Sequence, residues 1–123
     1  MKFLYLAPAY LPDNQFRSLA NIYGQVHVDH VTAIVETIKE ALNLIRQSEA
    51  QIVIVDDSLP LSVLADLVRP SINPLPVITS VVRQVPTGEK VLNPYTGAEE
   101  PQYELRLNWD RIIEVRVVTT PFL

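Results

Sequence analysis

The sequence predicts an α/β fold, a Rossmann-like three-layer domain with parallel N-terminal strands and a C-terminal antiparallel hairpin. Two observations predict it. Up to Pro76, short apolar runs alternate with segments of helical period, as in strand–helix–strand units with right-handed crossovers. From Val77 onward a period of two takes over, which is typical of antiparallel strands with one buried face.

The first predicted unit is a strand followed by a helix. An almost unbroken apolar run over Lys2–Ala7 is typical of a strand covered on both faces, and prolines follow it. Asp13 is placed to cap the next helix, and Gly24 to stop it in a left-handed conformation. The apolar positions of this helix fall on one face: Phe16, Leu19, Ala20 and Tyr23.

A second unit follows the same order. Val26–Val31 is a more polar strand, which we expect near an edge of the sheet. Thr37 and Glu40 have the spacing of a capping box and therefore predict the start of a helix. The buried stripe of that helix is expected at Ile38, Ala41, Leu42 and Ile45.

The third unit begins with Gln51–Val55, a strand dense in β-branched residues. The segment Leu59–Val68 then shows a helical face, with Pro60 in its first turn, and stops before Pro70.

The remaining chain is predicted to be antiparallel. Val77–Val85 is expected to be a strand, and Pro86–Gln102 a loop because it is rich in Gly, Pro, Asn, Thr and Glu. Tyr103–Trp109 alternates apolar and polar residues, as a strand with one buried face does. Ile112–Thr119 is expected to be one more strand.

Composition limits the classes of function. With 123 residues, 48% of them hydrophobic, the chain is expected to form one domain, 1–123, with a single core. A net charge of -4 gives no positive field, so we expect no bulk DNA or RNA binding. The chain has no cysteine and no apolar run of membrane length, so we expect a cytoplasmic protein without membrane contact.

Ligands of open α/β sheets gather at the carboxyl ends of the parallel strands. That rule nominates three segments: Ala7–Arg17, Thr32–Thr37 and Asp56–Leu61. The first segment brings Tyr10, Asn14, Gln15 and Arg17 to a helix N-terminus, where backbone N–H groups and a guanidinium favour an anion. The alternative is that Asp13 caps the helix and the other side chains are solvated.

The sequence offers no pattern typical of a metal site or a cofactor site. Asp56 and Asp57 favour a helix cap over Mg²⁺, because the end of the first strand offers only Ala7 and Pro8 and no further oxygen ligands. His27 and His30 point to opposite faces of a strand and cannot converge on a metal. The sequence also lacks a glycine-rich phosphate loop and a Ser–His–acid spacing, so we expect no metal and no cofactor.

One stretch, ETIKEALNLIRQSEAQIVIVDDSLP, resembles the middle of a two-component receiver domain. The resemblance covers about 40 residues and implies a phosphoacceptor at Asp56, four residues before Pro60. A receiver has acids after its first strand, where this chain has Ala7 and Pro8, and a lysine on its fifth strand, where this chain turns into a loop and hairpin. The receiver hypothesis is therefore that of a degenerate, non-catalytic interaction or scaffold domain.

Over nearly its full length the chain resembles small stand-alone proteins of the CRISPR-associated Rossmann fold (CARF) superfamily, including the short ring nucleases. The segments that carry the resemblance are LAPAYLPDNQ, VDDSLPLSVLADLV, PVITSVVRQV and YELRLNWDRIIEVRVV. The resemblance implies a homodimer in antiviral defence signalling that binds a cyclic oligoadenylate across its two-fold axis. It leaves open whether the chain cleaves the ring, without a metal, through attack by a ribose 2′-hydroxyl.

Such chemistry needs few side chains beyond those that hold the 2′-oxygen in line with the phosphorus and stabilise the phosphate. The polar groups that we expect near the ligand are Tyr10, Asn14, Gln15, Arg17, Ser58, Ser80 and Arg83. No catalytic residue can be assigned among them. The competing class is the interaction domain, in which the apolar hairpin and C-terminal segment join protein partners.

Overall fold

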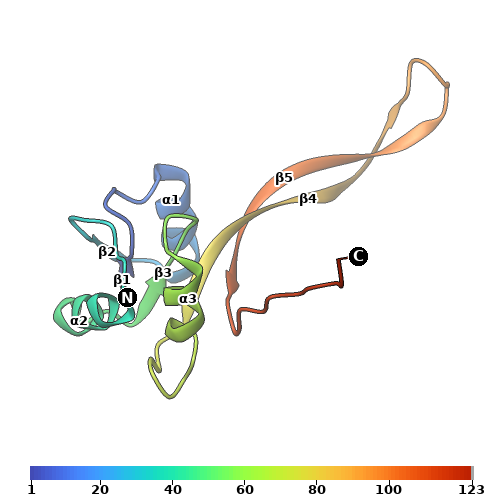
Figure 1. Ribbon diagram of the computed structural model, residues 1–123. Helices are drawn as coiled ribbons and strands as arrows, with labels where there is room; N and C mark the ends of the chain where they lie inside the picture. The colour runs from blue at the N-terminus through green and yellow to red at the C-terminus, as the bar shows by residue number, and fades with distance from the viewer. Residues whose placement is uncertain (123) are drawn as a thin grey trace.

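The computed structural model describes residues 1–122, and it shows one mixed sheet with helices on both faces and a long hairpin that leaves the body (Figure 1). The elements in chain order are β1 (Lys2–Tyr5), α1 (Asp13–Tyr23), β2 (His27–His30), α2 (Ile38–Ser48), β3 (Ile52–Ile54), α3 (Leu61–Leu67), β4 (Val77–Leu92) and β5 (Glu99–Arg111).

The five strands lie in the order β2-β1-β3-β4-β5. β1 pairs in parallel with β2 and β3, and β3 pairs in parallel with the start of β4. β4 and β5 are antiparallel. The predicted α/β class, the parallel N-terminal strands and the C-terminal hairpin are confirmed, as is the edge position of the second strand.

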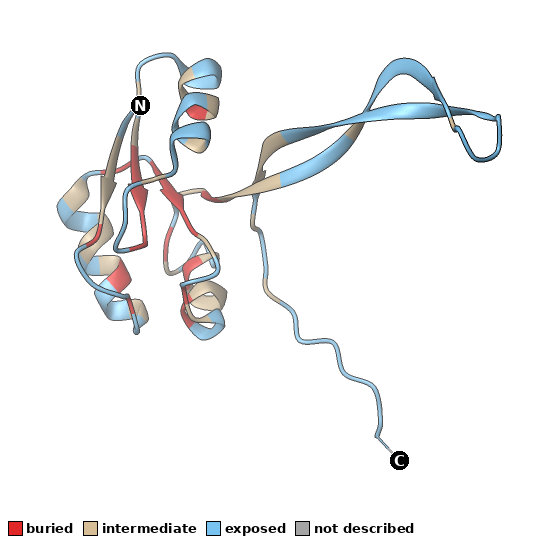
Figure 2. Ribbon diagram, turned by 90° about the horizontal axis from the view of Figure 1, so that it is seen from above, coloured by how far each residue is buried: buried red, intermediate tan, exposed pale blue. Residues whose placement is uncertain are grey.

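Two apolar cores lie on the two faces of the sheet, because alternate residues of each strand point to opposite sides. On one side, Leu4 and Val53 pack with residues of α2 and α3 such as Ala41 and Leu67. On the other side, Phe3 and its neighbours pack with Leu19 of α1. The buried residues concentrate in the body, and the hairpin beyond it is exposed (Figure 2).

Two of the predicted helix ends are confirmed and one is wrong. Gly24 ends α1 with φ 79°, and its N–H donates to the carbonyl of Ala20 at 2.8 Å. Thr37 caps α2 by accepting the Glu40 N–H at 3.2 Å. Asp13 is not the cap of α1, because the helix already includes it and begins after Pro12, whose fixed φ suits a helix start.

The loop predicted over 86–102 is wrong. β4 continues to Leu92 and β5 begins at Glu99, with a turn in which Asn93 and Ala98 are joined by a backbone hydrogen bond of 2.8 Å. The ladder of backbone hydrogen bonds between β4 and β5 continues through this segment although it contains turn-forming residues. The ladder accommodates them by a shift in register between Pro86 and Lys90. We call residues 82–92 and 99–106 the arm.

The strand predicted over 112–119 is also absent from the described part of the chain. The Ile112 N–H donates to the carbonyl of Val77 at 2.9 Å, and from Ile113 the chain continues without secondary structure to Phe122. We call residues 112–122 the tail. A strand needs a neighbour, and the tail leads away from the sheet of its own chain (Figures 1 and 2).

Candidate functional site

The strand order places a topological switch point between β1 and β3. From β1 the chain moves outward to β2 on one side, and it later continues from β3 to β4 on the other side. Loops that leave neighbouring strands in opposite directions open a crevice at the carboxyl ends, where open α/β sheets bind ligands. The loops after β1 and β3, residues 6–12 and 55–60, form the rim of this crevice.

A hydrogen-bonded trio stands at this switch point. Tyr5, the last residue of β1, is 6% exposed, and its hydroxyl donates to the carboxylate of Asp56. The Ser58 hydroxyl and backbone N–H donate to the same carboxylate at 2.5 and 2.9 Å. Asp56 therefore folds the loop after β3 back on itself, and the predicted cap of α3 is wrong because Pro60 occupies the cap position.

The trio fixes the ionisation of its members. Burial raises the pKa of Tyr5 to about 12, and the neighbouring carboxylate adds to that rise. Burial works against ionisation of Asp56, but hydrogen bonds from Ser58 and Tyr5 hold the pKa of that carboxyl below its ordinary value. At neutral pH the rim thus presents an ionised, half-buried carboxylate, which accepts hydrogen bonds from hydroxyl or amino groups and repels a phosphate.

Tyr10 lies at the outer side of the rim. Its side chain is 83% exposed and its ring contacts the ring of His30 at a tilt of 59°, with the two centroids 4.5 Å apart. Both rings border a cleft of about 420 Å³ between β2 and α2. Residues that line this cleft include Leu4, Tyr10, Asp29, His30, Leu44 and Gln47. Exposed aromatic rings beside a cleft can stack on a nucleobase.

The first turns of α1 carry the three other polar residues predicted after β1. Asn14 is exposed and Gln15 is partly buried. Arg17 forms an ion pair of 2.7 Å with Asp13, one helical turn earlier, and three quarters of its side-chain surface stays exposed. The guanidinium is therefore accessible to solvent, but the carboxylate of Asp13 already shares its charge.

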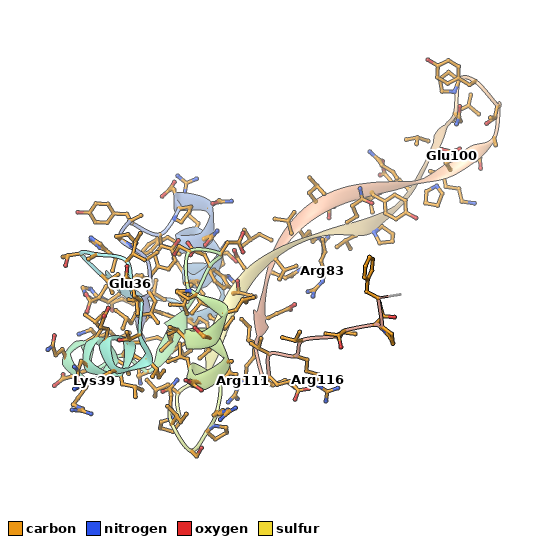
Figure 3. The ribbon with its side chains drawn as sticks, viewed as in Figure 1. Glu36, Lys39, Arg83, Glu100, Arg111 and Arg116 are labelled. Atoms are coloured by element: carbon orange, nitrogen blue, oxygen red, sulfur yellow. The ribbon has the colours of Figure 1, made fainter. Side chains whose placement is uncertain are left out.

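Ser80 and Arg83 do not lie together. They differ by an odd number of positions along β4, so their side chains point to opposite faces. Ser80 shares its face with Trp109, whose indole N–H donates to the Ser18 hydroxyl of α1 at 3.1 Å. Arg83 lies on the arm (Figure 3) and binds both carboxylate oxygens of Asp110 at 3.0 and 2.5 Å.

The ion pair with Asp110 makes Arg83 less available to a ligand. Hydrogen bonding to Arg83 holds the pKa of the Asp110 carboxyl below its ordinary value, so this pair is ionised at neutral pH. Tyr10, Asn14, Gln15, Arg17 and Ser58 thus follow the carboxyl ends of β1 and β3 along the chain, whereas Ser80 lies within β4 opposite Trp109 and Arg83 lies on the other face of the hairpin.

Sequence reasoning missed Tyr5 and His30 as parts of this region. A tyrosine at the end of a run predicted to be buried on both faces was the available signal, since a buried phenol needs a hydrogen-bond partner. His27 and His30 do point apart as predicted, with His27 bonded to Asp29 at 2.8 Å and His30 stacked on Tyr10. Within residues 1–122 no group of three His, Asp or Glu side chains is arranged to hold a metal ion.

Comparison with protein-family models, curated proteins and solved structures finds no match. None of the helices described over residues 1–122 combines the length and the apolar character that crossing a membrane requires.

Proposed function

We propose that this chain acts as a homodimer that binds a cyclic oligoadenylate, or a related nucleotide second messenger of CRISPR defence, at the rim of the switch-point crevice. The observation that carries the proposal is the Tyr5–Asp56–Ser58 trio, which keeps an ionised acceptor at the place where open α/β sheets bind ligands. A carboxylate at the end of a strand is a suitable acceptor for the hydroxyls of a ribose.

The other rim residues suit the remaining parts of such a ligand. The exposed ring of Tyr10, in tilted contact with His30, offers a flat surface for adenine. The amides of Asn14 and Gln15 and the guanidinium of Arg17 are donors for a phosphate, which has to lie away from Asp56. A bound phosphate would replace Asp13 as the partner of Arg17.

Ring cleavage is the catalytic form of the same proposal. The ligand's own ribose 2′-oxygen attacks the adjacent phosphorus, and the bond from phosphorus to the 5′-oxygen breaks. The products are a 2′,3′-cyclic phosphate and a 5′-hydroxyl, and the proton of the attacking hydroxyl passes to the leaving oxygen through solvent or a side chain. This reaction depends on holding the ring in an in-line geometry.

Thermal unfolding in the presence of cyclic oligoadenylates of several ring sizes tests the proposal. A ligand held at 100 times its dissociation constant stabilises the folded chain by about 2.7 kcal/mol, which gives a clear rise in melting temperature. The Asp56→Asn chain should lose most of this rise, whereas Asp57→Asn, an exposed neighbour, should keep it. No rise with any ring size refutes ligand binding, and chromatography of the incubated ligand decides between binding and cleavage.

A second candidate is a non-catalytic interaction domain of the degenerate receiver type. It is favoured by the apolar side chains that the arm and tail expose, such as Leu105 at 71% and Val117 at 86%. This candidate predicts a protein partner and no response to cyclic nucleotides. If acetyl phosphate and Mg²⁺ leave Asp56 unmodified, an active receiver is excluded while the interaction role stands.

A further inference from the structure

The part of β5 that leads into the arm has one apolar and one polar face. Residues directly opposite each other in the β4–β5 ladder share a face, as Val82 of β4 and Leu107 of β5 do. The apolar face of β5 comprises the odd-numbered Tyr103, Leu105, Leu107 and Trp109. It continues the core beside α1, where Trp109 packs, out into solvent, where Tyr103 is 53% exposed.

The tail repeats the pattern of β5. Its odd-numbered residues Ile113, Val115 and Val117 are apolar, and between them stand Glu114 and Arg116. β5 contains the same sequence of acid, apolar residue and base at Glu104–Leu105–Arg106. Each acid pairs with the base of its own triplet, so both segments display the two charges side by side on one face.

This repetition specifies a direction and a register for pairing the two segments. If Leu105 faces Val115 in an antiparallel ladder, Glu104 faces Arg116 and Arg106 faces Glu114, so both charged pairs attract. In the same register three apolar residues of β5 meet apolar residues of the tail, since Tyr103 faces Val117, Leu105 faces Val115 and Leu107 faces Ile113. A parallel ladder would set Glu against Glu and Arg against Arg.

The backbone of β5 is prepared for such a neighbour. β5 is an edge strand of the sheet. The Ile112 N–H donates to Val77 of β4, so the even-numbered residues of this strand turn their backbone groups toward β4. The odd-numbered residues, including Leu105, turn theirs to the open edge, and these are the residues that the register pairs. An edge of this kind is a template for another strand.

The tail of the same chain cannot fill this edge. Folding it back onto its own β5 in this register requires the chain to reverse between Asn108 and Ile112. Asn108 to Arg111 are paired with β4, and Ile112 bonds to Val77, so this segment is extended. The tail and its Arg116 lie apart from the arm (Figure 3). The strand that fits the edge therefore comes from a second copy.

We propose that two copies of this chain exchange tails, each tail adding antiparallel to the β5 edge of the other copy with Leu105 opposite Val115. One two-fold axis generates both ladders, because the register that places 105 against 115 also places 115 against 105, and the axis passes beside Asp110. The charge of Asp110 is already balanced by Arg83. The inference rests on the homodimer of the proposed function but not on its ligand.

Charge and size support a second copy as the occupant. The arm carries four acids, Glu89, Glu99, Glu100 and Glu104, and three bases, Arg83, Lys90 and Arg106, which disfavours a nucleic acid or an anionic membrane. The 19 residues of the arm and the 11 of the tail together make 30 residues, within the roughly 20–30 residues a side of a standard protein interface.

A charge-swap cycle on the full chain, followed by sedimentation, tests the register. Arg106→Glu and Glu114→Arg each place like charges opposite one another in both ladders, so each should raise the dissociation constant of the dimer about tenfold. The double variant should return to within about threefold of the unmodified chain. Arg46→Glu, an exposed site on α2 with the same charge change as Arg106→Glu, is the control. A monomeric chain, no recovery in the double variant, or equal weakening by Arg46→Glu overturns the proposal.

Cross-linking gives an independent readout, because the chain has no cysteine of its own. Chains with Leu105→Cys mixed with chains with Val115→Cys should be joined by a short bismaleimide. Neither variant alone should be, since its two copies of one position lie roughly 33 Å apart at ten residues of strand. Tail exchange is refuted if the charge variants do not change the dissociation constant of the dimer and the single-cysteine chains cross-link as well alone as when mixed. That outcome leaves ligand binding standing. Cross-linking as expected without a thermal shift refutes only the ligand.

Discussion

Replacing Tyr5 with phenylalanine should destabilise the chain at neutral pH and change how its stability depends on alkali. The substitution keeps the buried ring and removes the hydroxyl that donates to Asp56. A hydrogen bond to a charged group contributes about 1.5–3 kcal/mol, so we expect Tyr5→Phe to lower the free energy of unfolding by about 2 kcal/mol at pH 7.

The dependence on pH identifies the cause. An unfolded tyrosine releases its proton near the ordinary pKa of 10.0, whereas folded Tyr5 holds it to about 12. Between these values the folded state binds more protons than the unfolded state, so stability is complete below pH 10 and falls as the pH rises toward 12. From pH 9 to pH 11 this group alone should remove about 1.4 kcal/mol. Tyr5→Phe lacks that loss, so the two stabilities converge in alkali.

Urea unfolding from pH 7 to pH 11, followed by circular dichroism, measures both effects. Tyr95→Phe is the matched control, because the same hydroxyl is removed from a ring that is 95% exposed in the turn between β4 and β5, so its cost should be small. The reasoning is refuted if Tyr5→Phe unfolds with the same alkaline slope as the unmodified chain, or if Tyr95→Phe costs as much stability as Tyr5→Phe.

Two further substitutions test the body of the fold by the same unfolding assay. Thr37→Ala removes the oxygen that caps α2 through the Glu40 N–H and should cost about 1 kcal/mol, whereas Thr32→Ala in the exposed loop should cost little. Asn73 is 3% exposed and its amide satisfies two backbone carbonyls and one N–H, so Asn73→Leu should cost about 2–3 kcal/mol. Equal losses at Thr32, or at exposed Asn21 changed to Leu, would contradict these assignments.

Local patterns predicted the body of the fold because its residues answer to local rules. The apolar runs of β1 and β3 are buried on both faces, and Thr37 and Gly24 end their helices as their types require. The sequence predicted the edge position of β2 but not the rest of the strand order. The single core expected from composition is wrong, because alternate strand residues face opposite sides of the sheet and build two cores.

The arm and tail could not be predicted in the same way. Pro86, Gly88 and Gly97 favour turns, and sequence reasoning gave them a loop, but the partner strand and its register outweigh turn preference along a ladder in solvent. For the tail, the sequence predicted a strand where the structure has none over residues 112–122. Its β-branched alternation predicts a strand, but a strand depends on a neighbour that its own sheet does not provide within residues 1–122, so the prediction is wrong.

The sequence likewise predicted one part of the candidate site and not another. The rule that ligands gather at carboxyl strand ends located the rim and most of its polar residues. It could not foresee that Arg17 and Arg83 each hold a carboxylate, because Arg83 and Asp110 meet only through the register of the hairpin. Nor could it foresee the trio of Tyr5 and Asp56, whose residues lie 51 positions apart in the chain.

The rim and the strand that leads into the arm are joined by one contact between α1 and β5. Trp109 is bonded to Ser18 of α1, the helix that carries Asn14 and Gln15 at the rim. The same tryptophan belongs to β5 and lies next to Asp110, beside which the proposed two-fold axis passes. A ligand that orders α1 and a second copy that pairs with β5 therefore act on one contact. If each favours the same position of that contact, each strengthens the binding of the other by an equal factor, because coupling between binding sites is reciprocal.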